Sequence, residues 1–251
     1  MDLATIERAA ETILAPPNLV SAEARKEADR FFEELKKQIT INDCLSLLRQ
    51  SQNSFVLFQI GQALGEIVLR DWALIESNDV QMAYKTMLEF VATSPGIDTF
   101  VVGAFLKSAA MIIKRGILDG KSGDQEELYQ FIHGMLTNES ASLQAAGCLF
   151  ISALIEQFSS AWRNSKFSIT WDFHLQAKTQ FENNGLRRLL EMSLTTLHAL
   201  SNQDDIIGND FTRRLCDRFL EVSENILSWN FSSRLGFVEN ENEKELNWGG
   251  K

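Results

Sequence analysis

The sequence predicts an all-α protein, specifically a HEAT-repeat α-solenoid built from stacked antiparallel helix pairs. The chain has only 3 prolines and 14 glycines in 251 residues, too few turn signals for a β-rich fold of this size. Apolar residues recur at the three-to-four-residue spacing of amphipathic helices. The resulting helix pairs repeat about every 40 residues, which is typical of HEAT-type solenoids.

The predicted helices follow one another with clear boundary signals. Pro16-Pro17 separates the first two helices, and Ser21 is the expected N-cap of the second. Pro95-Gly96 divides the third pair, which Gly116 ends. The predicted helices span residues 2–15, 21–38, 41–51, 54–73, 79–94, 97–115, 124–137, 140–160, 171–182, 185–202 and 209–231. They form one domain over residues 1–238, followed by a polar, acidic tail at 239–251 that we expect to be frayed.

The stretch FVLFQIGQALGEIVLRDW, from Phe55 to Trp72, contains a Gly-x-x-x-Gly pattern at Gly61 and Gly65. In a membrane span this pattern allows two helices to approach closely. Polar residues interrupt the apolar run every three to four positions, at Gln59, Gln62, Glu66 and Arg70. We therefore expect no membrane insertion, but a helix buried on several sides with one polar strip, in which the two glycines are close-packing points.

The charge balance bears on the class of partner. Lys and Arg number 24 against 34 Asp and Glu, which gives a formal net charge of −10. This balance opposes binding to the phosphate backbone of nucleic acids. A basic protein partner is the better electrostatic match.

Cysteine usage and the N-terminus indicate the interior of the cell. The three cysteines, Cys44, Cys148 and Cys216, lie far apart and form no C-x-x-C pair, so we expect reduced, buried thiols. The opening residues MDLATIERAAETIL carry acidic side chains where a signal peptide has a basic region followed by a clean apolar one.

The string GILDGKS, from Gly116 to Ser122, comes closest to a nucleotide-binding motif. A P-loop requires G-x-x-x-x-G-K-[ST] between a strand and a helix. Here the spacing is one residue short and a helix precedes the string. We therefore expect Gly116 to end a helix.

Metal and catalytic motifs are also weak. DDIIGND, from Asp204 to Asp210, resembles the D-D-x-x-D motif that holds magnesium in all-α isoprenoid synthases, but its fifth position is Gly208. His133, His174 and His198 have no metal-ligand spacing, and we expect structural roles for them. No G-x-S-x-G elbow occurs. The sequence thus predicts no enzyme, no cofactor and no metal.

Solenoids often bind partners on the surface formed by successive inner helices. Two polar stripes are the candidates here, although ordinary solvated helix faces have the same composition. The candidate partner-binding residues are Lys26, Asp29, Glu33, Lys37, Gln59, Gln62 and Glu66.

Six strings resemble the importin-β superfamily of nuclear transport receptors. They are LAPPNLVSAEARKEADRFF at 14–32, VLFQ at 56–59 with VLRDW at 68–72, IIKRGILD at 112–119, DFH at 172–174 and LSWNF at 227–231. EARKEADRFF alone would suggest only the superfamily, with its N-terminal region within about residues 21–120. The ordered combination is similar to one family of exportins within it.

This resemblance implies a HEAT-repeat receptor that binds Ran-GTP through its N-terminal repeats, contacts nuclear pore proteins and shuttles between nucleus and cytoplasm. The implied protein cargo is translation factor 5A and Smad-type proteins. Exportins of this kind are several times longer, so the chain corresponds to an N-terminal portion. No short motif marks the Ran contacts. The alternative is a HEAT scaffold of another pathway, such as a phosphatase-type scaffold.

Overall fold

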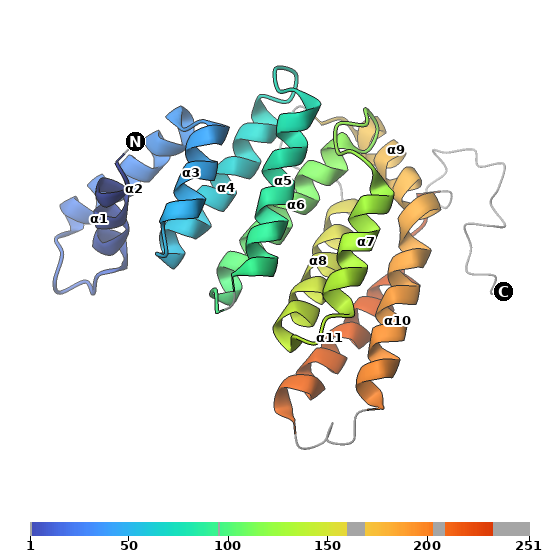
Figure 1. The fold of residues 1–251 in the computed structure, drawn as a ribbon. Helices are drawn as coiled ribbons and strands as arrows, with labels where there is room; N and C mark the ends of the chain where they lie inside the picture. The colour runs from blue at the N-terminus through green and yellow to red at the C-terminus, as the bar shows by residue number, and fades with distance from the viewer. Residues whose placement is uncertain (1, 95, 160–168, 203–208, 233–251) are drawn as a thin grey trace. The chain divides into compact units, whose positions relative to one another are not determined.

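A computed structural model describes residues 2–94, 96–159, 169–202 and 209–232. Within these residues every regular element is a helix, which confirms the predicted all-α class (Figure 1). The chain forms two compact units, Met1–Ile112 and Ile113–Lys251. We refer to them as unit 1 and unit 2.

Unit 1 consists of helix pairs. Its helices are α1 (Leu3–Leu14), α2 (Ala22–Gln38), α3 (Ile41–Gln50), α4 (Ser54–Arg70), α5 (Ser77–Thr93) and the first part of α6 (Thr99–Gly116). Helix α1 packs on α2, and α3 packs on α4. The rings of Phe90 and Phe105, 5.5 Å apart, join α5 to α6.

The pairs of unit 1 stack in two rows. Helices α2 and α4 are in contact, and the rings of Phe58 and Phe100, 5.7 Å apart, continue this row from α4 to α6. Helices α3 and α5 are in contact in the other row (Figure 1). Two rows of this kind are the arrangement that helical-repeat solenoids use to bury a continuous core.

Local capping explains where these helices begin. Ser21 Oγ accepts a hydrogen bond from Ala24 N at 3.1 Å, so Ser21 is the N-cap of α2 as predicted. Thr40 and Asp43 form a capping box at the start of α3. Asn53 caps two backbone N–H groups of α4. Each cap satisfies donors that the first helical turn leaves unpaired.

The two glycines of α4 are close-packing points, as the sequence predicts. A Cβ atom at Gly61 would overlap the buried ring of Phe105 on α6. A Cβ atom at Gly65 would lie 2.9 Å from Ser108 Cβ, closer than real Cβ contacts allow. The absence of side chains at these two positions therefore lets α4 and α6 approach each other.

Unit 2 also contains stacked pairs. Its helices are the end of α6, α7 (Gln125–Leu136), α8 (Ala141–Ser159), α9 (Trp171–Phe181), the π turn η2 (Glu182–Leu186), α10 (Arg187–Ser201) and α11 (Asp210–Leu227). Helix α7 packs on α8 and α10 on α11, while α8 contacts α11 and α7 contacts α10. Helix α9 lies beside α8.

The predicted break between helices 171–182 and 185–202 is wrong. The backbone stays helical from Trp171 to Ser201, because η2 joins α9 directly to α10. Asn183, Asn184 and Gly185 look like a helix stop by composition. Gly185 instead lies so close to the Tyr129 hydroxyl that a Cβ atom at position 185 would overlap this hydroxyl. This tertiary contact favours a continuous helix with a local π turn over a loop.

The end of the last predicted helix also differs. The sequence predicts a helix over 209–231, but α11 ends at Leu227. Ser228 is the C-cap. Trp229 and Ser232 leave the helix and are buried against the π turn, as their hydrogen bonds to Glu182 indicate.

Helix α8 is long and apolar enough to cross a membrane by length and composition alone. It is covered by α7, α9 and α11, which is the environment of a core helix in a helical stack. Helix α4 carries the glycine pattern, and its apolar residues lie in the core of unit 1. Its polar strip is partly exposed at Gln59 and Gln62 and exposed at Glu66 and Arg70, as expected.

Two further expectations have outcomes in the fold, and two others fall outside the described residues. Gly116 ends α6, and the GILDGKS string forms a turn between two helices, with Gly120 at a φ of 74°. All three cysteines are buried and free, as predicted. Residues 204–208 of the DDIIGND motif and the predicted tail at 239–251 lie outside the described residues.

Candidate partner-binding surface

The candidate residues on α2 lie on its exposed face. Lys26, Asp29, Glu33 and Lys37 are all exposed. The opposite side of α2 is buried at Ala28, Phe32 and Leu35. Ala24 and Phe31, beside this buried side, are half-buried. Helix α2 is therefore amphipathic, with one exposed face and one narrow buried stripe.

The candidate residues on α4 form the margin of a much more buried helix. Gln59 and Gln62 are half-buried and Glu66 is exposed. Most other positions of α4 face the core. A partner that reaches this strip can therefore touch few side chains of α4, and these are mainly carboxamides.

The structure joins α2 and α4 into one candidate face. Lys36 Nζ donates a hydrogen bond to Gln62 Oε1 at 3.3 Å. The rings of Phe32 on α2 and Phe55 on α4 also pack edge-to-face, 5.5 Å apart. Sequence reasoning missed Lys36, because its role depends on which helix lies next to α2. Its position four residues after buried Phe32 was the only available signal.

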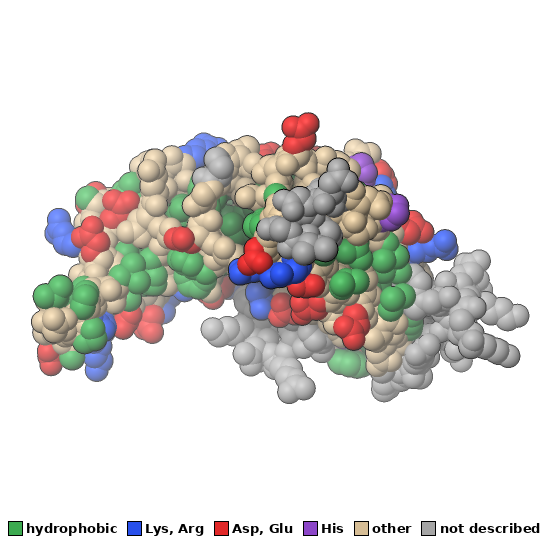
Figure 2. Space-filling model, turned by 90° about the horizontal axis from the view of Figure 1, so that it is seen from below, with side chains coloured by type: hydrophobic (Ala, Val, Ile, Leu, Met, Phe, Trp, Pro, Cys, Tyr) green, Lys and Arg blue, Asp and Glu red, His purple; other side chains and the backbone are tan. Residues whose placement is uncertain are grey.

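The candidate face carries charges of both signs. On α2, acidic and basic residues are equal in number: Glu23, Glu27, Asp29, Glu33 and Glu34 against Arg25, Lys26, Arg30, Lys36 and Lys37. Lys37 pairs with Glu34 at 2.7 Å, and this hydrogen bond raises the pKa of Lys37. Red, blue and green side chains likewise alternate at the end of the molecule that carries α1 and α2 (Figure 2). Recognition here would depend on individual pairs rather than on one strongly acidic patch.

A second polar feature lies inside unit 2. We call Lys114, His174, Lys178, Glu182 and Trp229 the buried polar cluster, since all five are buried. Lys114 Nζ donates to the Gln157 carbonyl at 2.6 Å and lies 3.1 Å from His174 Nδ1. Burial lowers the pKa of Lys114 to about 7. Burial and the neighbouring lysines lower the pKa of His174 to about 4.

Glu182 anchors the other half of the buried polar cluster. Its carboxylate accepts hydrogen bonds from Trp229 Nε1 at 2.7 Å and from Ser232 N at 3.0 Å. Lys178 Nζ lies 5.0 Å from the centre of the Trp229 ring. Burial raises the pKa of Glu182, which these hydrogen bonds oppose. Burial lowers the pKa of Lys178, which the charge of Glu182 opposes. The chain after α11 is thereby fastened to the π turn.

Three of the six resemblance strings meet in this cluster. IIKRGILD supplies Lys114, DFH supplies His174 and LSWNF supplies Trp229. His174 thus has a structural role, as expected, whereas His133 and His198 are exposed. Because the cluster is enclosed, it joins helices rather than binding a partner. Among the described residues, no group of three or more His, Cys, Asp and Glu side chains could hold a metal ion.

Comparisons with known proteins cover most of the chain. The family model of exportin-4 matches residues 6–240, which covers both units. A curated relative, Exportin-4 of Dictyostelium discoideum, is 22% identical over 214 residues. That match covers 78% of this chain but only 19% of the relative, so the chain spans about a fifth of its length.

The match extends over nearly the whole chain and includes every string that carried the resemblance. The family consists of transport receptors rather than enzymes, in agreement with the expectation from the sequence. The chain belongs to the exportin-4 family.

Proposed function

We propose that this chain is the N-terminal part of a nuclear transport receptor that binds Ran-GTP and carries protein cargo through nuclear pores. The observation that carries the proposal is the exportin-4 family match over residues 6–240. The match favours a transport receptor over a phosphatase-type HEAT scaffold. The proposed receptor moves between nucleus and cytoplasm and contacts nuclear pore proteins, and translation factor 5A and Smad-type proteins are its proposed cargo.

The proposed Ran contact is the face formed by α2 and α4. Its residues are Lys26, Asp29, Glu33, Lys36, Lys37, Gln59, Gln62 and Glu66. The Lys36–Gln62 hydrogen bond supports it, because it places the two stripes side by side. Glu33 and Glu66 are exposed and can pair with basic groups. Gln59 and Gln62 can donate and accept hydrogen bonds at the centre of the face.

Titration of the protein with Ran loaded with GTP or with GDP tests this proposal. We expect tighter binding to the GTP form, weakened by salt because exposed charges are screened over about 8–10 Å at physiological ionic strength. The double variant Glu33→Lys/Glu66→Lys should lower the affinity by about 1–3 kcal/mol if both pairs are partly desolvated.

The matched control is Glu139→Lys/Glu224→Lys. It reverses two exposed glutamates of unit 2 and changes the net charge of the chain by the same amount. The control should bind Ran-GTP as the parent does. Equal binding of both nucleotide forms would refute the Ran assignment. Equal loss of affinity in both double variants would refute the α2–α4 face, because it would reflect net charge alone.

A further inference from the structure

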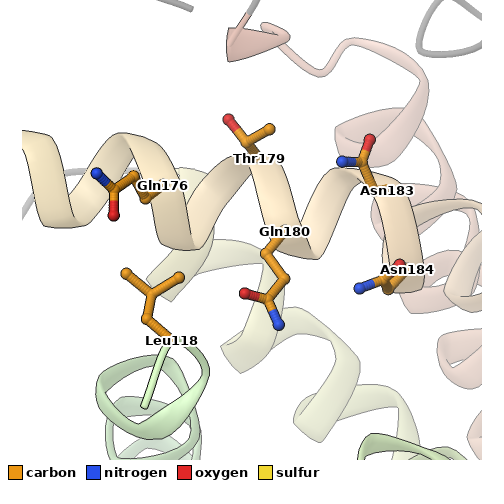
Figure 3. A pocket seen from close by; sticks show the side chains of 6 residues that line it. All are labelled: Leu118, Gln176, Thr179, Gln180, Asn183 and Asn184. Carbon is orange, nitrogen blue, oxygen red and sulfur yellow. The ribbon is translucent and has the colours of Figure 1, made fainter. Parts of the chain in front are cut away.

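Unit 2 contains a shallow groove that the proposed Ran contact does not use. Its volume is about 350 Å³. The lining residues are Leu118, Gln176, Thr179, Gln180, Asn183 and Asn184 (Figure 3). Leu118 comes from the turn between α6 and α7, and the others come from α9 and the π turn η2. The floor of the groove is therefore one continuous helix, formed by α9 and η2.

The lining is uncharged and rich in side-chain amides. None of the six side chains is ionisable, and four of them are carboxamides. Thr179 Oγ1 donates back to the Leu175 carbonyl at 2.9 Å. Among the described residues, no hydrogen bond ties the four carboxamides to another group. Each can therefore offer two N–H donors and one carbonyl acceptor to a ligand.

Three of the carboxamides form a row along the helix made by α9 and η2. Gln176, Gln180 and Asn184 are spaced four residues apart, and Figure 3 shows Gln176 and Gln180 on the side of α9 nearer Leu118. The row exists only because η2 continues the helix. If the chain broke at Asn183, as its composition suggests, Asn184 would leave the row. Single π turns occur frequently at functional sites.

The spacing of this row matches an extended polypeptide. Gln176 and Gln180 both lie on α9, where four residues of α-helix rise about 6 Å. Two residues of an extended chain span about 6.7 Å. A strand lying along α9 would thus present every second peptide group to successive carboxamides. Each carboxamide can accept from the N–H and donate to the C=O of that strand.

Other ligand classes fit less well. A phosphate or carboxylate group needs cationic side chains or backbone N–H groups, and the lining supplies no cation. A cationic ligand likewise finds no acidic side chain there. Leu118 is partly exposed and gives a ligand side chain one apolar contact.

We propose that the groove binds an extended peptide segment of a partner protein through its main chain, with Gln176, Gln180 and Asn184 pairing with alternate peptide groups. Recognition is largely independent of the ligand's side chains, apart from one apolar residue placed against Leu118. The site lies in unit 2, whereas the proposed Ran contact lies in unit 1. Either proposal can fail without the other.

The first test selects peptides from a random decapeptide display library on the full chain. Selected peptides are titrated into protein labelled with ¹⁵N-glutamine, and the side-chain NH₂ resonances are followed by NMR. The resonances of Gln176 and Gln180 should shift on binding, and those of Gln38 and Gln52 should not. Two N-methylated versions of each peptide are then compared, one methylated at the odd-numbered backbone amides and one at the even-numbered amides. One version should bind at least tenfold more weakly, and the other should bind nearly as well as the unmodified peptide.

The second test is the double variant Gln176→Glu/Gln180→Glu. It keeps side-chain size and acceptors but removes the donors, and it should weaken peptide binding at least tenfold. The control Gln38→Glu/Gln52→Glu makes the same chemical change at two exposed positions of unit 1 and should bind as the parent does. Far-UV circular dichroism and the unfolding midpoint check that both variants fold.

Three results would overturn the proposal. The first is a selection that yields no peptide shifting the Gln176 and Gln180 resonances. The second is equal binding of the peptide methylated at its odd-numbered amides and the peptide methylated at its even-numbered amides. The third is a folded Gln176→Glu/Gln180→Glu variant that binds the selected peptides as tightly as the parent.

Discussion

Unit 1 and unit 2 stack helix pairs in the same way but hold them together with different chemistry. In unit 1, α4 and α6 approach because Gly61 and Gly65 carry no side chains, and aromatic rings fill the adjoining space. In unit 2, the buried polar cluster joins the end of α6, α9 and the chain after α11 through hydrogen bonds. A helical-repeat core thus tolerates buried charges where their hydrogen bonds are satisfied.

The difference has an energetic consequence. Apolar packing is non-directional, so the neighbouring side chains can shift after a substitution. The loss in free energy of unfolding therefore depends on how far they can relax. Removing one partner of a buried ionic group costs more free energy, because the remaining groups stay desolvated and unpaired. We therefore expect unit 2 to be more sensitive to single polar substitutions than unit 1 is to single packing changes.

The largest expected effect is that of Glu182→Ala. The substitution removes the acceptor of both the Trp229 indole and the Ser232 backbone N–H. It should lower the free energy of unfolding by about 3–5 kcal/mol, measured by urea denaturation. Glu221→Ala, at an exposed position on α11, should change it little. If both variants unfolded at the parent's midpoint, the cluster would not stabilise unit 2.

The matching change in unit 1 is Gly61→Leu. A leucine must displace the Phe105 ring, so the free energy of unfolding should fall by about 1–3 kcal/mol. Gly65→Leu should act in the same direction through Ser108. Gly103→Ala on α6 is the control, because a Cβ there meets no atom within 4 Å. Thermal melting of the three variants decides whether the close approach of α4 and α6 limits stability.

The pH dependence of stability separates the two units further. The folded pKa of Lys114 is about 7, below its ordinary value of 10.5. Between these values the unfolded chain binds a proton that the folded chain has released, so stability rises with pH. Burial raises the pKa of Cys44 and Cys148 to about 12, and these thiols act in the opposite direction above pH 9.0. The window between about pH 7 and 9 therefore reports on Lys114 and on Lys178, whose pKa burial also lowers.

Over this window the free energy of unfolding should increase by about 2 kcal/mol. Lys114→Met should flatten the rise, since it removes the titrating group. Lys26→Met, at an exposed position of α2, should keep it. Urea denaturation at several pH values measures each slope. An unchanged slope in Lys114→Met would mean that this lysine remains charged when buried.

The smallest expected effect concerns association. Leu220 and Leu227 lie seven residues apart on α11 and are 54% and 57% exposed. Such an apolar stripe on a helix face favours contact with another helix. We expect weak, concentration-dependent self-association in analytical ultracentrifugation, which Leu220→Lys/Leu227→Lys should remove. Leu14→Lys/Leu19→Lys, which alters exposed leucines at a turn of unit 1, should leave it unchanged. A clean monomer at high concentration would contradict this expectation.

The sequence by itself determined the fold class and nearly all helix positions. Helical periodicity, the Ser21 cap and the Gly116 stop are signals within a few neighbouring residues, so they can be read without a fold. The same holds for the packing role of Gly61 and Gly65, because a glycine on the buried side of an apolar helix has few other uses. The exposure of the candidate residues on α2 followed from the same periodicity.

Only the tertiary structure decided which side chains meet. The Lys36–Gln62 bond depends on the adjacency of α2 and α4. The buried polar cluster unites residues from 114 to 229, each of which looks like an ordinary surface or helix residue in its own segment. The π turn overrides the local helix-stop signal, and the need for glycine at position 185 comes from the close approach of Tyr129 on α7. Local sequence encodes backbone preference, whereas the burial of charge and the continuity of a helix depend on partners far along the chain.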